Sequence, residues 1–246
     1  MANLFILTAV VYCSYSKGIQ ASRREQVYVE IKHRIVHGVC APGAPLCEAE
    51  LARQLRTSRT PVREALSRLI EEGYVERVAG RGYLVTPITV TLIQNIFEVR
   101  RLLEGAAAAR AAELADAAAI ARLRELATCE YASGDAAGFR MAAEANGAFH
   151  LALAQASRNA IIANLVRHCL DQVTRIIALG VDYAPLQKSA SGEHDAVVDA
   201  IARRDPEGAR AAVERHLDGS TRRMMDALMH GGTCAVTVSR AAAGGS

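Results

Sequence analysis

The sequence predicts a mainly α-helical protein in two parts: a small N-terminal domain with three helices and a β-hairpin, and a C-terminal all-α bundle of six antiparallel helices. Three observations lead to this prediction. Apolar residues follow helical spacing through most of the chain, and two short alternating runs surround Gly80-Arg81-Gly82. At 246 residues, with 51% hydrophobic and 22% charged residues, the chain is long enough for two folded domains.

The N-terminal domain is predicted to form a winged helix-turn-helix. Its first helix ends at Gly38, and a short second helix runs from about Glu48 to Leu55. A third helix ends before Gly73, and residues 74–78 and 83–86 are the strands of a hairpin. In such a domain the third helix enters the major groove of DNA, while the hairpin lies along the backbone or the minor groove.

The start of the third helix is marked by capping residues. Ser58 or Thr60 is placed to cap the helix, and Pro61 falls in its first turn, where a missing N–H costs little. The helix therefore begins immediately after the second one ends.

Around this start the chain is strongly basic. Four arginines precede the first acid, Glu64: Arg53, Arg56, Arg59 and Arg63. The last two lie one turn apart on one face of the helix N-terminus, whose dipole and free N–H groups attract phosphate. A solvated basic face is the alternative interpretation. Because helix N-termini normally favour Asp and Glu, the pattern favours contact with DNA.

The same residues resemble a known family. The run Ser58-Arg59-Thr60-Pro61-Val62-Arg63-Glu64-Ala65-Leu66, with its flanking Pro42-Gly43 and Arg81-Gly82, resembles the GntR-type bacterial transcription regulators over residues 25–87. The resemblance implies that Arg59 and Arg63 contact bases or phosphates, that Thr60 holds the DNA backbone, and that Arg81 and Gly82 form the wing. With the phosphate contacts expected from charge, the candidate DNA-binding residues are Arg53, Arg56, Ser58, Arg59, Thr60, Arg63, Arg81 and Gly82.

The rear of the chain, residues 88–230, is rich in alanine and contains no sustained alternating run, so it is predicted to be all helix. Asp135 and Asp205 are predicted N-caps, the second followed by Pro206 at the first helical position. The six predicted helices are Leu92–Leu114, Ala117–Ser133, Ala136–Ser157, Ile161–Val181, Leu186–Arg203 and Pro206–Met229. Such helices pack as an antiparallel bundle.

Charge divides the chain in the same way. Residues 21–87 contain eleven Lys/Arg and eight Asp/Glu, and residues 88–230 contain sixteen and eighteen. A basic front and a mildly acidic rear suit a nucleic-acid-binding head on a body with another role. Residues 1–20 are predicted to be a disordered extension and residues 231–246 a disordered tail.

Other features favour a cytoplasmic protein without a membrane partner. The apolar run Leu4–Tyr12 is too short to span a bilayer, and no Lys or Arg precedes it as in a signal peptide. Six cysteines occur without a CxxC pair, which indicates reduced thiols rather than a zinc finger.

Four residues of the rear domain form a candidate metal site. Asn146 and His150 lie four apart on one predicted helix, so both point the same way. His194 and His216 lie on apolar faces of the last two helices. Three imidazoles and one oxygen suit a divalent transition metal such as zinc, nickel or manganese. The alternative is that each histidine is an ordinary core or surface residue.

These residues carry a second resemblance. The segments Asn146-Gly147-Ala148-Phe149-His150, Glu193-His194-Asp195-Ala196-Val197 and His216-Leu217 resemble the FCD effector domain of the FadR subfamily, and six helices resemble its shorter, VanR-like branch. The resemblance implies a metal, zinc first, held by Asn146, His150, His194 and His216. This chain has Asn where Asp is frequent, and an amide oxygen is a weaker ligand than a carboxylate.

The FCD resemblance also implies a small carboxylate effector over the metal. Arg100 matches the arginine of the first effector-domain helix, where a guanidinium clamps a carboxylate at two points. Glu104, one turn later, is placed to orient Arg100. The alternative for Arg100 is a surface salt bridge to Glu104.

Together these patterns predict a homodimeric transcription regulator rather than an enzyme. It would bind a pseudo-palindromic DNA operator, and an organic acid bound at the metal site would change its DNA affinity. A direct metal sensor is one alternative. A metal-dependent hydrolase is the other, with Glu193 as the only nearby candidate base. The sequence names neither the effector, the operator, the metal nor the sign of regulation.

Overall fold

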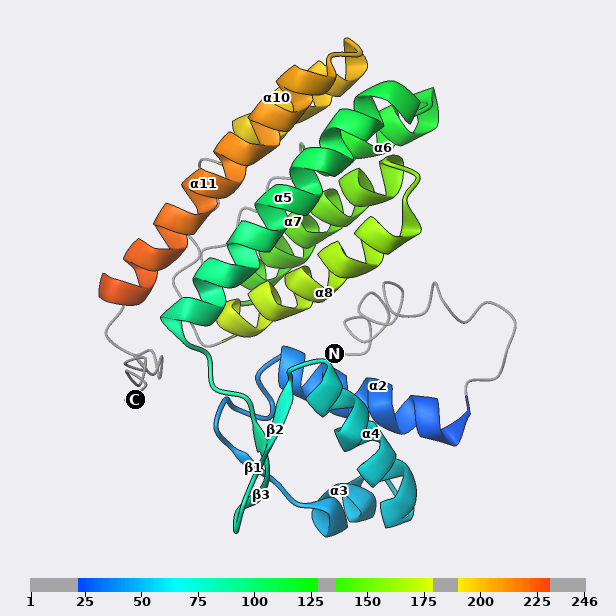
Figure 1. Cartoon of the computed structure of the whole chain (residues 1–246), viewed down its shortest axis with the longest axis vertical. Helices are drawn as coiled ribbons and strands as arrows, with labels where there is room; N and C mark the ends of the chain where they lie inside the picture. Colours follow the sequence, from blue (N-terminus) through cyan, green and yellow to red (C-terminus); the bar gives the residue numbers. More distant parts are fainter. Residues whose placement is uncertain (1–21, 128–135, 179–189, 231–246) are drawn as a thin grey trace, which may run out of the picture. The chain divides into compact units, whose positions relative to one another are not determined.

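The computed structural model describes residues 22–127, 136–178 and 190–230 (Figure 1). The predicted extension over residues 1–20 and the tail over residues 231–246 lie outside these ranges. The predicted cap Asp135 lies outside them too.

Two compact units make up the described chain. One contains residues 22–35 and 40–86, and the other contains residues 36–39 together with the described residues from Pro87 onward. None of the described helices combines the length and the hydropathy needed to cross a lipid bilayer.

The first unit holds three helices and a small antiparallel sheet, as a winged helix-turn-helix requires. The helices are α2 (Arg23–Val36), α3 (Glu48–Gln54) and α4 (Arg59–Glu71), and the strands are β1 (Pro45–Leu46), β2 (Val75–Val78) and β3 (Gly82–Val85). The strand order is β1-β3-β2, and Val78 pairs with Gly82 at the hairpin end. The sequence prediction missed β1, because two residues are too few to show an alternating pattern.

The hairpin tip owes its shape to two glycines. Gly80 and Gly82 have φ angles of +75° and +77°, a region that side chains disfavour. The N–H of Arg81 donates to the carbonyl of Val78 at 3.0 Å and closes the turn. Arg81 is therefore held at the exposed tip of the wing.

The second unit contains helices at each of the six predicted places. They are α5 (Val90–Leu114), α6 (Ala117–Ala127), α7 (Ala136–Ala156), α8 (Ala160–Ile177), α10 (Ala190–Ala202) and α11 (Pro206–His230). The predicted cap is confirmed at Asp205, whose carboxylate accepts from the N–H of Gly208 at 2.9 Å. Thr89 and Asn159 cap α5 and α8 in the same way.

Helix α5 lies at the centre of this bundle, packed against α7, α8, α10 and α11 (Figure 1). Small residues let the helices approach closely: a Cβ atom at Gly105 would lie 2.9 Å from Oε1 of Glu214 on α11. The alanine-rich core therefore brings polar side chains of α5, α7, α10 and α11 within hydrogen-bonding reach of one another.

Candidate DNA-recognition surface and candidate metal centre

Helix α4 begins where the sequence predicted, but without the expected side-chain cap. Ser58 occupies the N-cap position with extended backbone, and its hydroxyl makes no capping hydrogen bond. An N-cap side chain bonds the N–H of the second or third helical residue, and the third residue here is Pro61, which has none. Thr60 lies inside the helix and is exposed. Of the two predicted residues, Ser58 holds the N-cap position, but its side chain makes no capping hydrogen bond, so the first turn keeps backbone donors that no side-chain cap satisfies.

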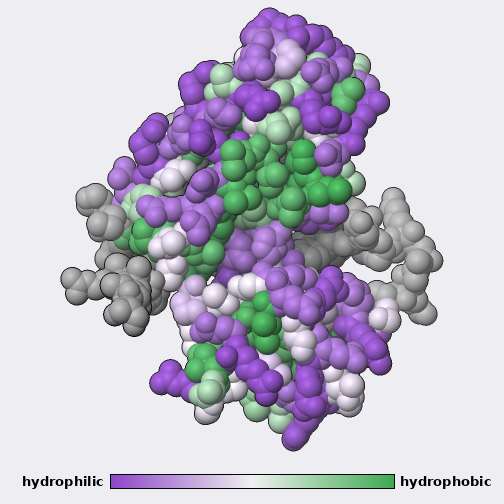
Figure 2. All heavy atoms as spheres, viewed as in Figure 1, coloured by the Kyte–Doolittle hydropathy of each residue, from purple (hydrophilic) through white to green (hydrophobic). Residues whose placement is uncertain are grey.

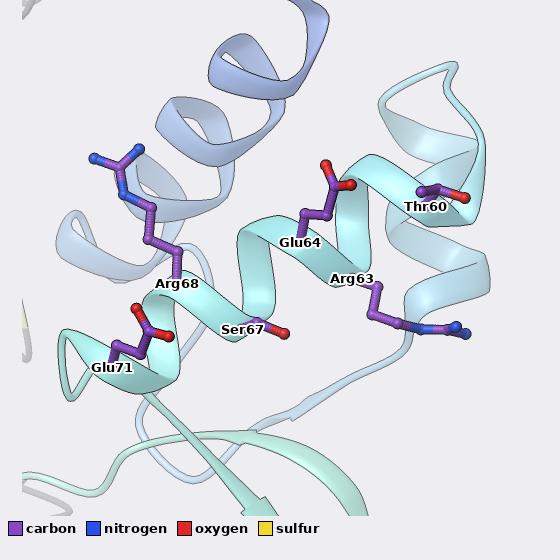
Figure 3. Close-up of a pocket in the computed structure, with 6 residues that line it drawn as sticks. All are labelled: Thr60, Arg63, Glu64, Ser67, Arg68 and Glu71. Carbon is purple, nitrogen blue, oxygen red and sulfur yellow. The ribbon is translucent and has the colours of Figure 1, made fainter.

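The outer side of α4 forms a shallow groove of about 590 Å³ (Figure 3). Two of its charged residues form ion pairs with residues outside it: Glu64 pairs with Arg24 on α2, and Arg68 pairs with Glu25 and Glu72. The groove is lined by Thr60, Arg63, Glu64, Ser67, Arg68 and Glu71. The N-terminal half of the groove presents Thr60, Arg63 and Ser67 to solvent.

Arg63 is held by a residue that the sequence analysis did not single out. Its Nε and Nη2 atoms donate to the two carboxylate oxygens of Glu48 on α3 at 3.0 and 2.9 Å. The hydrogen bond from Arg63 holds the pKa of Glu48 below its usual value, and Tyr83 on β3 also interacts with this carboxylate. Glu48 therefore connects α3, the start of α4 and the wing.

The other predicted DNA-binding residues are also exposed. Arg59 is the first residue of α4, and Arg53 on α3 makes two hydrogen bonds to Glu50. Arg56 lies in the turn between α3 and α4 with a φ angle of +50°, and its carbonyl accepts from Arg23. With Arg81 at the wing tip, these positions supply several positive charges on the first unit.

The second unit brings the three predicted histidines together in its core. His150 on α7, His194 on α10 and His216 on α11 are 0%, 5% and 2% exposed. The Nε2 atom of His216 lies 3.2 Å from that of His150 and 3.3 Å from that of His194. One ligand atom from each ring falls within 4.8 Å of the others. Asn146, one turn before His150 on α7, is half-buried.

Carboxylates hold the outer edges of two of these rings. Nδ1 of His150 lies 2.6 Å from Glu104, and Nδ1 of His216 lies 2.7 Å from Glu193. A neutral imidazole that donates from Nδ1 has its lone pair on Nε2, so the lone pairs of both rings face the centre of the cluster. Lone pairs this close repel one another unless a cation lies between them. The donor set therefore fits a divalent metal.

Burial and neighbouring charges keep His150, His194 and Glu104 in the protonation states that metal binding requires. Burial lowers the pKa of His150 to about 4 and that of His194 well below its usual value. Burial alone would raise the pKa of Glu104, but the neighbouring Arg100 and His150 outweigh it and lower the pKa to about 2. The imidazoles of His150 and His194 are thus neutral and the carboxylate of Glu104 ionised at neutral pH.

Arg100 lies next to this cluster and not on the surface. It is 2% exposed, and its Nε donates to Glu104 at 2.7 Å. Its Nη2 atom is buried without a hydrogen-bond partner among the described residues. The surface salt bridge considered for Arg100 is therefore wrong, while the expected contact with Glu104 is present.

Glu193, considered above as a catalytic base, instead binds Arg223 and the outer edge of the His216 ring. Its two oxygens accept from Nη1 and Nη2 of Arg223 at 3.1 and 3.0 Å, and one of them also meets His216. The carboxylate binds the outer edge of the ring, on the side away from the shared Nε2 atoms. Neither carboxylate–histidine pair was predicted from the sequence, because Glu104 is 46 residues from His150 and Glu193 is 23 residues from His216.

Two known family models match this chain, one in each compact unit. The model of bacterial regulatory proteins of the gntR family matches residues 23–85, and the model of the FCD domain matches residues 95–219, half of the chain. The chain belongs to the GntR family. Its GntR domain contains α2 to α4 and the wing sheet, and its FCD domain contains Arg100, Glu104 and the three clustered histidines.

Relatives of this GntR protein extend over most of its length. The HTH-type transcriptional regulator LutR of Bacillus subtilis (strain 168) is 33% identical over 205 residues, 74% of this chain and 92% of LutR. The HTH-type transcriptional repressor RspR of Escherichia coli (strain K12) is 26% identical over 193 residues, 78% of this chain and 85% of RspR.

A solved structure shares the two-domain fold. It is that of a GntR-type protein from Rhodococcus sp. RHA1, described as a transcriptional regulator, with 26% identity and a TM-score of 0.69. The match covers 84% of this chain and 99% of that one. The GntR protein is accordingly a bacterial transcription regulator with a winged helix-turn-helix domain and an all-helical FCD domain.

Proposed function

We propose that this GntR regulator binds a pseudo-palindromic DNA operator as a homodimer, and that a small carboxylate bound at a metal site in the FCD domain changes its DNA affinity. The observation that carries the proposal is the buried chain Arg100–Glu104–His150. It joins a guanidinium, whose Nη2 group has no hydrogen-bond partner among the described residues, to one ring of a three-histidine cluster.

The metal would be held by the Nε2 atoms of His150, His194 and His216, with the amide oxygen of Asn146 as the fourth ligand. Zinc is the first candidate because it accepts three imidazoles, and nickel or manganese are alternatives. The metal would supply a Lewis-acid anchor for an anionic ligand. Because all four ligands are neutral, the ion would keep its full positive charge, which favours an anion above it.

Arg100 would bind the carboxylate of the effector. Glu104 takes the Nε edge of the guanidinium, so the buried Nη2 group is available to a ligand oxygen. A charge-assisted hydrogen bond in a buried site is strong, and it would satisfy a donor that otherwise remains unpaired. This site resembles that of the FadR subfamily and its VanR-like branch, to which we assign the chain.

A homodimer is supported by an apolar face of the FCD domain. Hydrophobic residues gather over α5 and the helices beside it (Figure 2). Among the residues of α5 and α8, Leu102 is 63% exposed and Ile161 is 72% exposed, and the exposed Val99 and Leu165 lie one turn away from them along the same helices. Helices α5 and α8 pack against each other, so these residues belong to neighbouring surfaces. Exposed apolar patches of this kind mark protein interfaces.

Two measurements on the full-length protein test the proposal. Selection from a random duplex DNA library should yield a two-fold symmetric sequence. Fluorescence anisotropy with that duplex should then show a change in affinity when a panel of small carboxylates is added, and the change should disappear with a chelator. If chelation alone changes the affinity and no carboxylate does, the protein is a direct metal sensor. If no sequence is selected, the DNA-binding proposal is wrong.

A further inference from the structure

The GntR domain contains an acidic residue in the middle of its basic surface. Glu48 is the first residue of α3, and its carboxylate forms a two-point ion pair with Arg63 of α4. The Arg63 side chain is 63% exposed, and that of Glu48 is 20% exposed. An acid at this place costs affinity for every DNA sequence, because it repels the phosphates that the arginines attract.

The geometry of the pair leaves one edge of the Arg63 guanidinium open. Glu48 occupies the Nε and Nη2 donors on one side. The opposite edge, made by Nη1 and the second hydrogen of Nη2, meets no hydrogen-bond partner in the part of the chain that the structure describes. A guanidinium edge of this kind is the donor pair that binds O6 and N7 of guanine in the major groove.

We propose that Glu48 is a specificity-determining residue: it fixes the plane of Arg63 so that the free edge recognises one guanine in each operator half-site. The inference rests on the proposed DNA-binding function and deepens it. Glu48 acts as a positioning residue through Arg63.

A second ion pair on the same helix provides a matched control. Glu50 binds Arg53 through two hydrogen bonds, and both side chains are exposed on α3. Glu50 lies in the same acidic first turn as Glu48, so both interact similarly with the helix dipole. The pairs differ in position, because the Glu50–Arg53 pair lies within α3, whereas the Glu48–Arg63 pair crosses to the helix proposed to read DNA.

The test compares base preferences of full-length wild type, Glu48→Gln and Glu50→Gln in selections from a random duplex library. Glu48→Gln keeps the shape but loses the charge and one acceptor oxygen. We expect it to lose about tenfold in discrimination for guanine at one position of each half-site. Binding to unrelated duplex should rise, since a negative charge has been removed. Glu50→Gln should keep every base preference.

A second variant keeps the test decisive if Glu48→Gln folds poorly. Arg63→Lys retains the positive charge but has no two-point edge. It should lose preference at the same base position, and the double variant should lose no more than either single variant. Unchanged guanine preference in Glu48→Gln, or loss at different positions in the two variants, would overturn the inference. A wild-type protein that selects no sequence would instead refute the proposed DNA-binding function.

Discussion

In the core of the FCD domain, Nδ1 of His150 and Oε2 of Glu104 lie 2.6 Å apart, and neither side chain is exposed. The other oxygen of Glu104 accepts from Arg100. One buried carboxylate therefore orients a proposed metal ligand and a proposed effector-binding residue at once. Through Glu104, a ligand that moves Arg100 would also shift the ring of His150. In the same way, a metal bound to that ring would change the position of Arg100.

The pKa of His150 predicts how the stability of the metal-free protein depends on pH. Its pKa is lowered to about 4 by burial, whereas a histidine in the unfolded chain has a pKa near 6.5. Between these values the unfolded state binds more protons, so the free energy of unfolding should fall as the pH falls. The contribution of His150 is of the order of 3 kcal/mol across this window, and none is expected above about pH 7. Urea unfolding followed by circular dichroism measures it. Replacement of His150 by Gln should reduce the slope without removing it, because burial also lowers the pKa of His194, and an unchanged slope would contradict the assignment.

Removing one histidine should remove the metal. His150→Ala, His194→Ala and His216→Ala should each lower metal affinity by more than the roughly 10–100-fold typical of supporting residues, since a ligand itself is lost. Metal content of the purified protein by mass spectrometry checks this. His168→Ala, on α8 outside the cluster, is the control and should keep the metal. Full occupancy in all three cluster variants would refute the proposed site.

Arg100→Lys should abolish the response to carboxylate effectors and preserve DNA binding. Lysine keeps the charge beside Glu104 but lacks the Nη2 donor that the effector would bind. In a thermal-shift screen, the stabilisation of wild type by an active carboxylate should disappear in the variant. Arg101→Lys is the matched control, because Arg101 is the next residue on α5 and is exposed. A response that persists in Arg100→Lys would exclude the clamp.

Arg59→Ala should weaken binding to the selected duplex by about 1–3 kcal/mol, roughly five- to 150-fold, because it removes a proposed DNA contact at the N-terminus of α4. Fluorescence anisotropy measures the affinity, and size-exclusion chromatography should show an unchanged dimer. Arg122→Ala provides the comparison, since Arg122 is an exposed arginine of the FCD domain paired with Glu125. Equal affinities of the Arg59 and Arg122 variants would remove Arg59 from the DNA-recognition surface.

Leu102→Asp should convert the proposed dimer to a folded monomer. Leu102 is 63% exposed, so a charge there costs little within one chain but is buried without a partner in the proposed interface. Sedimentation equilibrium gives the association state, and circular dichroism gives the helix content. Arg122→Asp serves as a surface control on α6. A Leu102 variant that remains dimeric would place the interface elsewhere.

The sequence by itself determined the elements and their order. Helical spacing and breaks such as Gly38 and Asp205 located the helices within a few residues, because these signals act over one or two turns. The Arg59–Arg63 run and the spacing of Asn146 and His150 identified candidate residues for the same reason. The strand β1 escaped detection, because its two residues are defined only by pairing with β3.

Only the tertiary structure decided which distant side chains meet. Glu48 meets Arg63 across two helices, Glu104 meets His150 across 46 residues, and Glu193 meets His216 across 23. The absence of a side-chain cap at Ser58 also follows from its context, since Pro61 supplies no N–H. Such contacts depend on how helices pack, and packing depends on buried surfaces spread along the whole chain. The basic run at the start of α4 can therefore be recognised from neighbouring residues in the sequence. The carboxylates that contact Arg63, His150 and His216 cannot, because they come from other helices.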